Sequence, residues 1–188
     1  MKKLILVLPL VFVLTSGAGC RTGYDGPYKG RVIDAETGLP IEGVVVLGVW
    51  YKEIPNPAGS SSTYYDARET VTDEKGDFYI PGMGPLILST VQTMHVLIFK
   101  AGYEYIGMGP WEAFKVDRLF QEKIKWEGNR AIVPLKKLRR EERERQMPPS
   151  EPPVEAPLRK VRLMLEEINK DLIARGVKPI TMWGGKKL

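Results

Sequence analysis

The 188-residue sequence has a single cysteine, Cys20, and a single histidine, His95. With one cysteine, no disulfide can form within the chain, and a catalytic zinc site would need a set of histidine, cysteine or carboxylate ligands. A serine or cysteine triad would need His95 as its base. That residue lies within "TMHVLIF", an apolar segment that predicts a strand. We therefore expect no catalytic residue, no metal and no cofactor.

A large excess of charge of either sign is also lacking, because the formal net charge is +5. Residues 134–188 carry 14 Lys and Arg against 8 Asp and Glu, whereas residues 20–133 carry 12 against 15. The basic excess therefore lies in the C-terminal part. The basic residues of "KKLRREERER", residues 136–145, alternate with glutamates, which predicts a solvated helix with i, i+4 ion pairs. We expect no nucleic-acid partner.

Three carboxylates, Asp73, Glu74 and Asp77, cluster within "TVTDEKGDFYIPGMG" at residues 70–84. Clustered oxygen ligands can bind calcium, but an EF-type loop needs acidic or amide residues at alternate positions and a terminal glutamate. This segment lacks that spacing. Gly76 is typical of a hairpin position with positive φ, and Asp73 can accept hydrogen bonds from the backbone of a turn. The cluster therefore predicts a turn between two strands.

The N-terminal segment has two lysines, an apolar run over residues 4–14 and small residues before Cys20. This is the layout of a secretory signal peptide, and the run is shorter than the roughly 20 residues that span a bilayer. The residues "AGC" at 18–20 resemble the lipobox of bacterial lipoproteins. The resemblance implies a leader at residues 1–19, acylation of Cys20 and a tether at residues 20–27. Arg21 in place of an aspartate implies the outer membrane, on the side facing the periplasm.

Short β-branched and aromatic segments, separated by glycine and proline, predict an all-β body. We expect seven strands, at residues 28–34, 44–53, 64–72, 77–81 and 130–138, with two from residues 94–108, which could also form one strand bent at 101–102. A loop is expected at 56–62. Frequent turn residues between short strands favour a sandwich over a parallel α/β sheet.

Four motifs stand in an order that resembles the carboxypeptidase regulatory-like domain. They are "GRV" at 30–32, "TGLPIEGVVV" at 37–46, "TDEKGDF" at 72–78 and "KAGY" at 100–103. The resemblance implies a transthyretin-like (prealbumin-like), seven-stranded Greek-key β-sandwich over residues 28–138. Two segments, 81–94 and 109–129, are longer than the family pattern, and the second predicts a short helix. We expect any specialised surface to lie in these insertions.

The C-terminal part predicts a helical extension of the sandwich. A charged and proline-rich linker is expected at residues 139–156, an amphipathic helix at 157–176 and a tail at 177–188. The apolar stripe of the helix consists of Val161, Leu165, Ile168 and Leu172. Such a helix is marginal alone, so its stripe needs a surface. That surface is the sandwich, a second copy of the chain or a partner.

These features predict a non-enzymatic, lipid-anchored protein of the cell envelope whose sandwich serves as a binding or structural module. The membrane is one expected partner through Cys20, and an envelope protein, a peptide or a carbohydrate is another. Amphipathic aromatics are common at binding surfaces, which makes Trp50, Tyr51, Tyr64, Tyr65 and Trp111 the candidate ligand contacts. The alternatives are an assembly subunit that docks a partner through the C-terminal helix, and a hydrolase.

Overall fold

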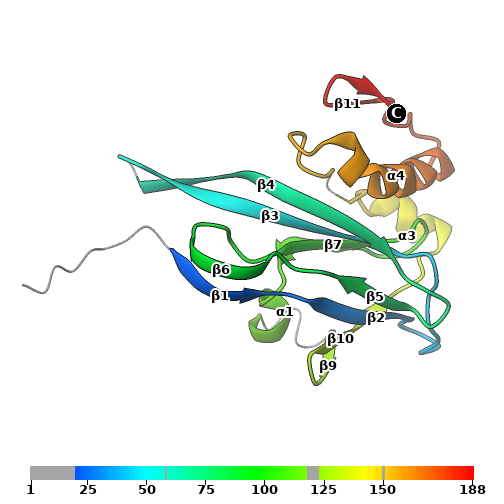
Figure 1. Ribbon diagram of the computed structural model, residues 1–188. Helices are drawn as coiled ribbons and strands as arrows, with labels where there is room; N and C mark the ends of the chain where they lie inside the picture. The colour runs from blue at the N-terminus through cyan, green and yellow to red at the C-terminus, as the bar shows by residue number, and fades with distance from the viewer. Residues whose placement is uncertain (1–19, 58, 118–122, 150) are drawn as a thin grey trace, which may run out of the picture.

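The computed structural model describes residues 20–57, 59–117, 123–149 and 151–188. Two four-stranded sheets face each other, and a C-terminal layer covers the outer face of one of them (Figure 1). The all-β, sandwich-like architecture expected from the sequence is confirmed. The expected leader, residues 1–19, lies outside the described residues.

The first sheet has the strand order β5-β2-β10-β9, and the second has the order β4-β3-β7-β8. Strands β2 and β10 are parallel, and the other neighbours are antiparallel. The first sheet consists of β2 (Tyr28–Asp34), β5 (Asp77–Ile80), β9 (Lys125–Glu127) and β10 (Arg130–Leu135). The second consists of β3 (Val45–Asn56), β4 (Gly59–Val71), β7 (His95–Phe99) and β8 (Ile106–Pro110).

Two small ribbons and four helical segments complete the described chain. The ribbons are β1 (Arg21–Asp25) with β6 (Gly84–Ser89), and β11 (Met182–Trp183) with β12 (Lys186–Lys187). The helical segments are α1 (Ala113–Val116), α3 (Arg140–Arg145), the 3₁₀ turn η1 (Leu158–Lys160) and α4 (Arg162–Ala174). The described residues thus form twelve strands, and each of the seven expected segments contains one.

The hairpin of β3 and β4 is longer than the sequence predicts. Residues 56–62 were expected to form a loop, but the strands remain paired as far as Asn56 and Gly59. An extra residue in β4 opposite the step from Trp50 to Tyr51 forms a bulge. Beyond this bulge the hairpin projects from the body (Figure 1). Bulges increase the local twist of a strand and bend it, which fits a hairpin that leaves the plane of its sheet here.

Strand β3 is buried on both faces from Val45 to Trp50. One face, with Val46 and Trp50, lies in the core between the sheets, and the other, with Leu47, lies beneath the C-terminal layer. This explains why the sequence here is a continuous apolar run rather than an alternation, since a strand covered on both faces has no solvent side. The run "VVVLGVW" was therefore a sign of a third layer.

Helix α4 packs its apolar stripe against the outer face of the second sheet. Met164, Leu165 and Ile168 are fully buried in a cluster with Leu47 and Phe99 from that face. The sequence left open whether this helix packs on the sandwich, on a second copy of the chain or on a partner. The structure shows that it packs on the sandwich. The stripe is therefore covered by the second sheet.

The start of α4 is capped by a residue from a distant strand. No side chain within the helix caps its first turn, and the Glu69 carboxylate on β4 accepts hydrogen bonds from the amides of Leu163 (3.1 Å) and Met164 (2.7 Å). An anion at this position satisfies free amides and interacts favourably with the helix dipole. Burial raises the pKa of Glu69, and these two hydrogen bonds oppose that shift.

The expected linker and tail are also held to the body. The Arg175 guanidinium donates to the backbone oxygens of Arg143 and Gln146, and it pairs with buried Asp171 at 2.5 Å. At the other end, the Trp183 indole donates to the oxygen of Ala156 at 3.1 Å. The described parts of residues 139–156 and 177–188 are therefore held by contacts with the helix and with each other rather than extending freely.

The acidic cluster of residues 73–77 forms a turn, as predicted. One Asp73 oxygen accepts hydrogen bonds from the amides of Lys75 (2.9 Å) and Asp77 (2.8 Å). Asp77 instead pairs with Arg31 at 2.9 Å and with Arg130 on the first sheet. Asp73 and Asp77 thus stabilise the turn that connects β4 of the second sheet to β5 of the first. No group of three or more potential metal ligands occurs among the described residues.

Replacing Gly76 with alanine should lower the free energy of unfolding by about 2 kcal/mol or more. Its φ is 72°, and a Cβ at this position would lie 2.4 Å from the carbonyl oxygen of Val32. Gly38→Ala is the matched control, because φ is 70° there but the space around the Cβ is open. Urea unfolding followed by tryptophan fluorescence measures both. Equal losses would show that the close approach to Val32 contributes nothing.

Candidate functional site

The five aromatic residues expected to contact a ligand lie in three separate places. Trp50 is fully buried and Trp111 is 5% exposed, both in the core between the sheets. Their rings surround Tyr28, with centroid distances of 6.2 Å and 5.5 Å. Because neither indole has a face toward solvent, the expectation that they contact a ligand is corrected. They are core residues.

Tyr51 and Tyr64 face each other across the β3–β4 hairpin, on the outer side of the second sheet. Both are half-buried, and burial raises the pKa of each phenol. The Tyr51 ring meets the His95 imidazole edge to face at 5.2 Å, and burial lowers the pKa of His95. In the described part of the chain, no serine, cysteine or carboxylate hydrogen-bonds to His95. Of the five expected aromatics, Tyr51 and Tyr64 are thus partly accessible on this face, and Tyr65 is exposed elsewhere on the hairpin.

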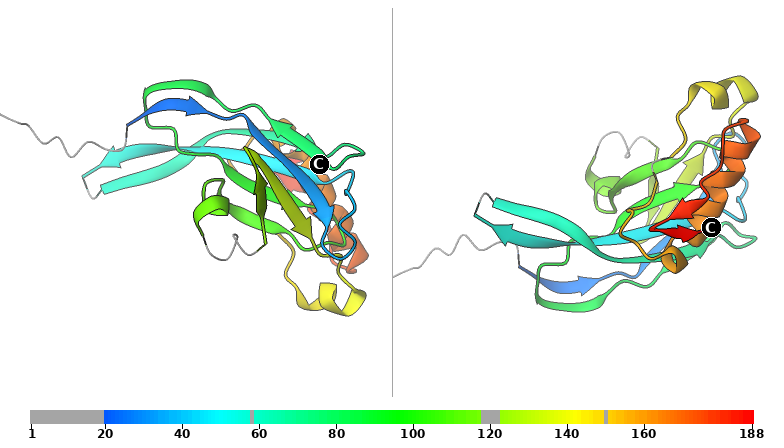
Figure 2. Two further views of the ribbon diagram at one scale, coloured as in Figure 1. Left: turned by 90° about the horizontal axis from the view of Figure 1, so that it is seen from below. Right: turned by 90° about the horizontal axis from the view of Figure 1, so that it is seen from above.

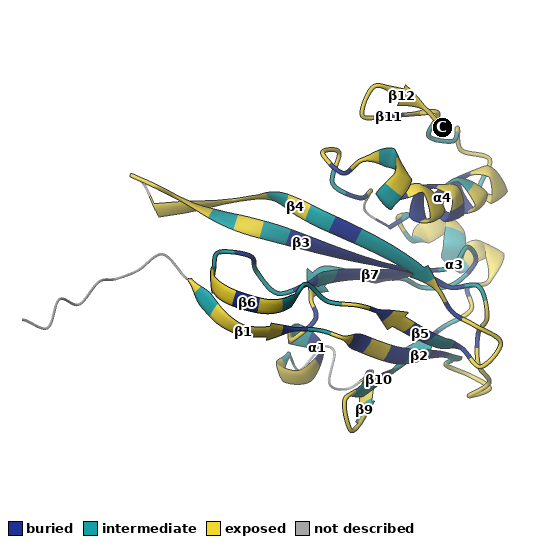
Figure 3. Cartoon of the chain, in the orientation of Figure 1, coloured by how far each residue is buried: buried dark blue, intermediate teal, exposed yellow. Residues whose placement is uncertain are grey.

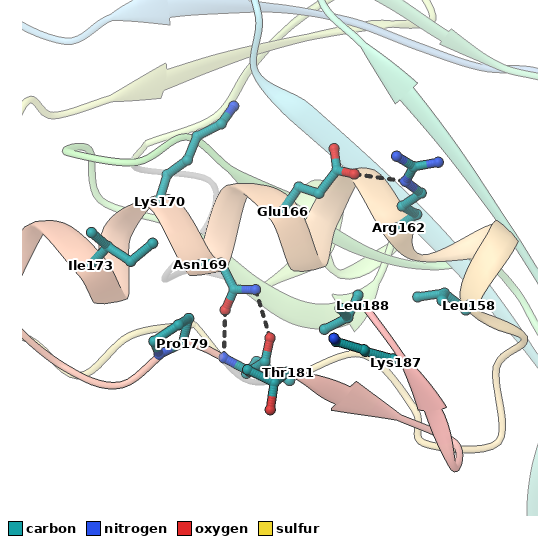
Figure 4. A pocket seen from close by; sticks show the side chains of 11 residues that line it. Leu158, Arg162, Glu166, Asn169, Lys170, Ile173, Pro179, Thr181, Lys187 and Leu188 are labelled. Carbon is teal, nitrogen blue, oxygen red and sulfur yellow. Dashed lines mark hydrogen bonds and ion pairs between the residues drawn. The ribbon is translucent and has the colours of Figure 1, made fainter.

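A cavity of about 560 Å³ lies between α4 and the C-terminal segment. Three of its polar side chains are engaged with the protein, as Figure 4 shows: Arg162 pairs with Glu166 at 2.7 Å, and the Asn169 amide forms two hydrogen bonds with the backbone of Ile180. The Asn169 hydrogen bonds hold the C-terminal segment against the helix. This part of the lining therefore serves packing within the chain rather than ligand binding.

A different surface lies where the described chain begins. Cys20 is exposed and directly precedes β1. The expected tether is instead folded, because β1 pairs with β6 and places Arg21 opposite Ser89 and Tyr24 opposite Pro85. The partner strand β6 belongs to the inserted segment 81–94. A tether could not be told from an edge strand by sequence alone, since the partner lies some 60 residues away.

Strand β1 is fixed to the core by the carboxylate of Asp25, which is 1% exposed. The Tyr28 hydroxyl donates to it at 2.6 Å, the Trp50 indole at 2.8 Å and the Met83 amide at 3.0 Å. Arg21 lies 3.8 Å away. Burial and the hydrogen bond to Asp25 raise the pKa of Tyr28 well above its usual range. A buried carboxylate with three donors forms a rigid joint.

The far end of the same ribbon is joined to the β3–β4 hairpin. The amide of Glu53 donates to the oxygen of Thr90 at 2.9 Å, and the amide of Gln92 donates to the oxygen of Tyr51 at 2.8 Å. Between them, Lys52 pairs with Val91. The ribbon and the base of the hairpin are therefore one unit. In Figure 2 both lie at the end of the molecule where β1 starts, away from α4.

Five exposed apolar or aromatic side chains belong to this unit, and we call them the ribbon-end surface: Tyr24, Ile54, Tyr65, Ile87 and Leu88. Ile87 is 79% exposed and Leu88 75%. Leu88, Ile54 and Tyr65 line a common groove of about 570 Å³ between β6 and the hairpin. Figure 3 shows this end of the molecule as mostly exposed. Three such residues that line one groove, rather than lying singly, indicate a contact surface.

Charge is sparse around the ribbon-end surface. Residues 54–65 and 78–99 contain no Asp, Glu, Lys or Arg. The charged side chains nearest to the groove are Lys52 and Glu53, which line it. Sequence reasoning identified the inserted segment and Tyr65, but it missed Tyr24 and Ile54. The uncharged stretches were the sign that could have found this surface.

Comparison of the chain with protein-family models, with curated proteins and with solved structures gave no match. Among the described residues, no helix combines the length and the apolar character needed to cross a membrane.

Proposed function

We propose that the protein is a non-enzymatic, lipid-anchored protein of the cell envelope whose β-sandwich is a binding or structural module. The observation that carries this proposal is the position of Cys20, exposed and immediately before the first strand. A lipobox-like "AGC" ends the expected leader at this residue. Several acyl chains at about 0.8 kcal/mol per buried CH₂ would anchor the protein stably. With Arg21 following the cysteine, the outer membrane is the proposed location.

The finer proposal for the body is a transthyretin-like, Greek-key sandwich of the carboxypeptidase regulatory-like kind. Two of the four family motifs support it by their places in the fold. The "GRV" motif lies on β2, and "TDEKGDF" forms the turn that enters β5. The family resemblance suggests a peptide or a carbohydrate as partner, and Tyr51 with Tyr64 is the proposed contact.

Replacing Cys20 with serine should release the protein from membranes, because serine cannot carry the thioether-linked lipid. The expected result is a shift of nearly all of the protein from the sedimented membrane fraction to the soluble fraction, together with loss of the mass increase due to acylation. Full-length protein in a bacterial host is fractionated by ultracentrifugation and measured by mass spectrometry. Arg21→Ser serves as the control and should stay acylated and membrane-bound. Membrane retention of the Cys20→Ser protein would refute the lipid anchor.

A further inference from the structure

We propose that the ribbon-end surface lies within the headgroup region of the membrane that holds Cys20, so that the lipid bilayer itself is the ligand of this surface. The inference rests on the proposed lipid anchor and extends it. The anchor alone would attach the protein to a membrane in any orientation. The ribbon-end surface gives it one orientation.

The first argument is distance along the chain and across the ribbon. Consecutive Cα atoms are about 3.8 Å apart, and antiparallel partners are at most about 5.5 Å apart. Ser89 is opposite Arg21, so its Cα lies within roughly 10 Å of the Cα of Cys20. Tyr24 is four residues from Cys20 and therefore within about 14 Å. Acyl chains on Cys20 would hold both strands of this ribbon at the membrane surface.

The second argument is rigidity. A free tether would let the domain stand away from the bilayer, but β1 starts at the residue after Cys20. Asp25 joins β1 to the core, and residues 90–92 join β6 to the base of the hairpin. The ribbon therefore keeps a fixed position on the body, and its apolar side chains stay close to Cys20 instead of moving away on a flexible tether.

The third argument is chemistry. Isoleucine, leucine and tyrosine side chains are suited to the boundary between headgroups and acyl chains, where amphipathic rings are enriched. The neighbouring hairpin tip presents serine, threonine, asparagine and proline and no charge, so its approach to lipid requires no ion to be desolvated. Of the charges nearby, Arg21 and Lys52 suit anionic headgroups, and the Glu53 carboxylate accepts a hydrogen bond from Ser60.

The backbone conformation of Leu88 gives a further, independent indication that this surface makes a contact. Leu88 is the one non-glycine residue among those described that has a positive φ, at 47°. A left-handed conformation disfavours a leucine, and such strain persists where surrounding structure imposes it, often at contact sites. The amide of Leu88 is held by the Thr22 hydroxyl at 3.2 Å. The ribbon therefore fixes this side chain in an exposed position beside the groove.

The test uses the full-length acylated protein in vesicles of phosphatidylethanolamine and phosphatidylglycerol. Since Cys20 is blocked by lipid, a Leu88→Cys variant offers one thiol for an environment-sensitive fluorophore. We expect blue-shifted emission and quenching by aqueous iodide that is about threefold weaker than for a water-exposed label, because the probe would lie 5–10 Å deep. Ile173→Cys is the matched control, since Ile173 is also well exposed but lies on α4.

The outcomes separate this inference from the proposed function. Co-sedimentation of the protein with vesicles, combined with equal quenching at residues 88 and 173, would overturn the inference and leave the anchor intact. Failure to sediment at all would refute the anchor instead. Protection at residue 88 in native envelopes but not in pure lipid vesicles would overturn the lipid as ligand in favour of a protein partner. Protection in both supports the inference.

Discussion

Replacing Asp25 with alanine should lower the free energy of unfolding by about 4 kcal/mol, since a buried donor left unpaired costs about 1–3 kcal/mol. Three donors lose their acceptor at once: the Tyr28 hydroxyl, the Trp50 indole and the Met83 amide. Tyr28 and Trp50 belong to the core between the sheets, where water cannot replace the carboxylate easily. Urea unfolding of the protein lacking its leader, followed by tryptophan fluorescence, measures the loss.

Asp25→Asn is the matched control for this variant. The amide oxygen can still accept from Trp50 and Met83, while the amide nitrogen donates to the Tyr28 hydroxyl, which can accept. Charge assistance and the hydrogen bond donated by the Tyr28 hydroxyl are lost, but the other two donors keep their acceptor, so we expect a smaller decrease of about 1–2 kcal/mol. In vesicles, Asp25→Ala should also let the labelled residue 88 be quenched more strongly, because β1 then becomes the tether that the sequence suggested. If Asp25→Ala lowered the free energy of unfolding no more than Asp25→Asn does, Asp25 would not be the group that joins β1 to the core.

The parts of the fold that could be predicted from sequence depend on neighbours in the chain. The turn at Asp73 and Gly76 is local, and each of its hydrogen bonds spans at most four residues. The strands β2 and β5 and the helix α4 likewise follow from periodicity and end residues. Such elements carry their own pattern, so one sequence is enough to place them.

The parts that could not be predicted depend on partners far apart in the chain. Asp25 meets Trp50 and Met83 at separations of 25 and 58 residues. Glu69 caps a helix more than 90 residues later. The sequence around Asp25 therefore does not reveal that this carboxylate is buried or which groups donate to it. A sequence pattern indicates which face of an element is apolar, but it does not indicate which distant segment covers that face. The candidate aromatics show the same limit, since burial separates Trp50 from its neighbour Tyr51.

Replacing Leu165 with aspartate should lower the free energy of unfolding by about 4 kcal/mol or more, because the apolar contact is lost and a charge must enter a dry interface. Leu165 is fully buried between α4 and the second sheet. Ile173→Asp on the same helix is the control, and it should stay within about 0.5 kcal/mol of the native protein because residue 173 is exposed. Urea unfolding gives both values.

Limited proteolysis of the same variants then shows whether the loss of stability is confined to α4 or extends to the sandwich. Helix α4 covers Leu47, Leu97 and Phe99, so its release would expose an apolar sheet face to water. We therefore expect the Leu165→Asp protein to be cut within residues 139–157 and also to unfold as a whole, since a two-layer sandwich with that face bare is poorly stable. A cut protein whose sandwich persisted, or a variant as stable as the control, would show that α4 is a separable element. Its stripe would then be free for a partner, and the assembly hypothesis would regain its main support.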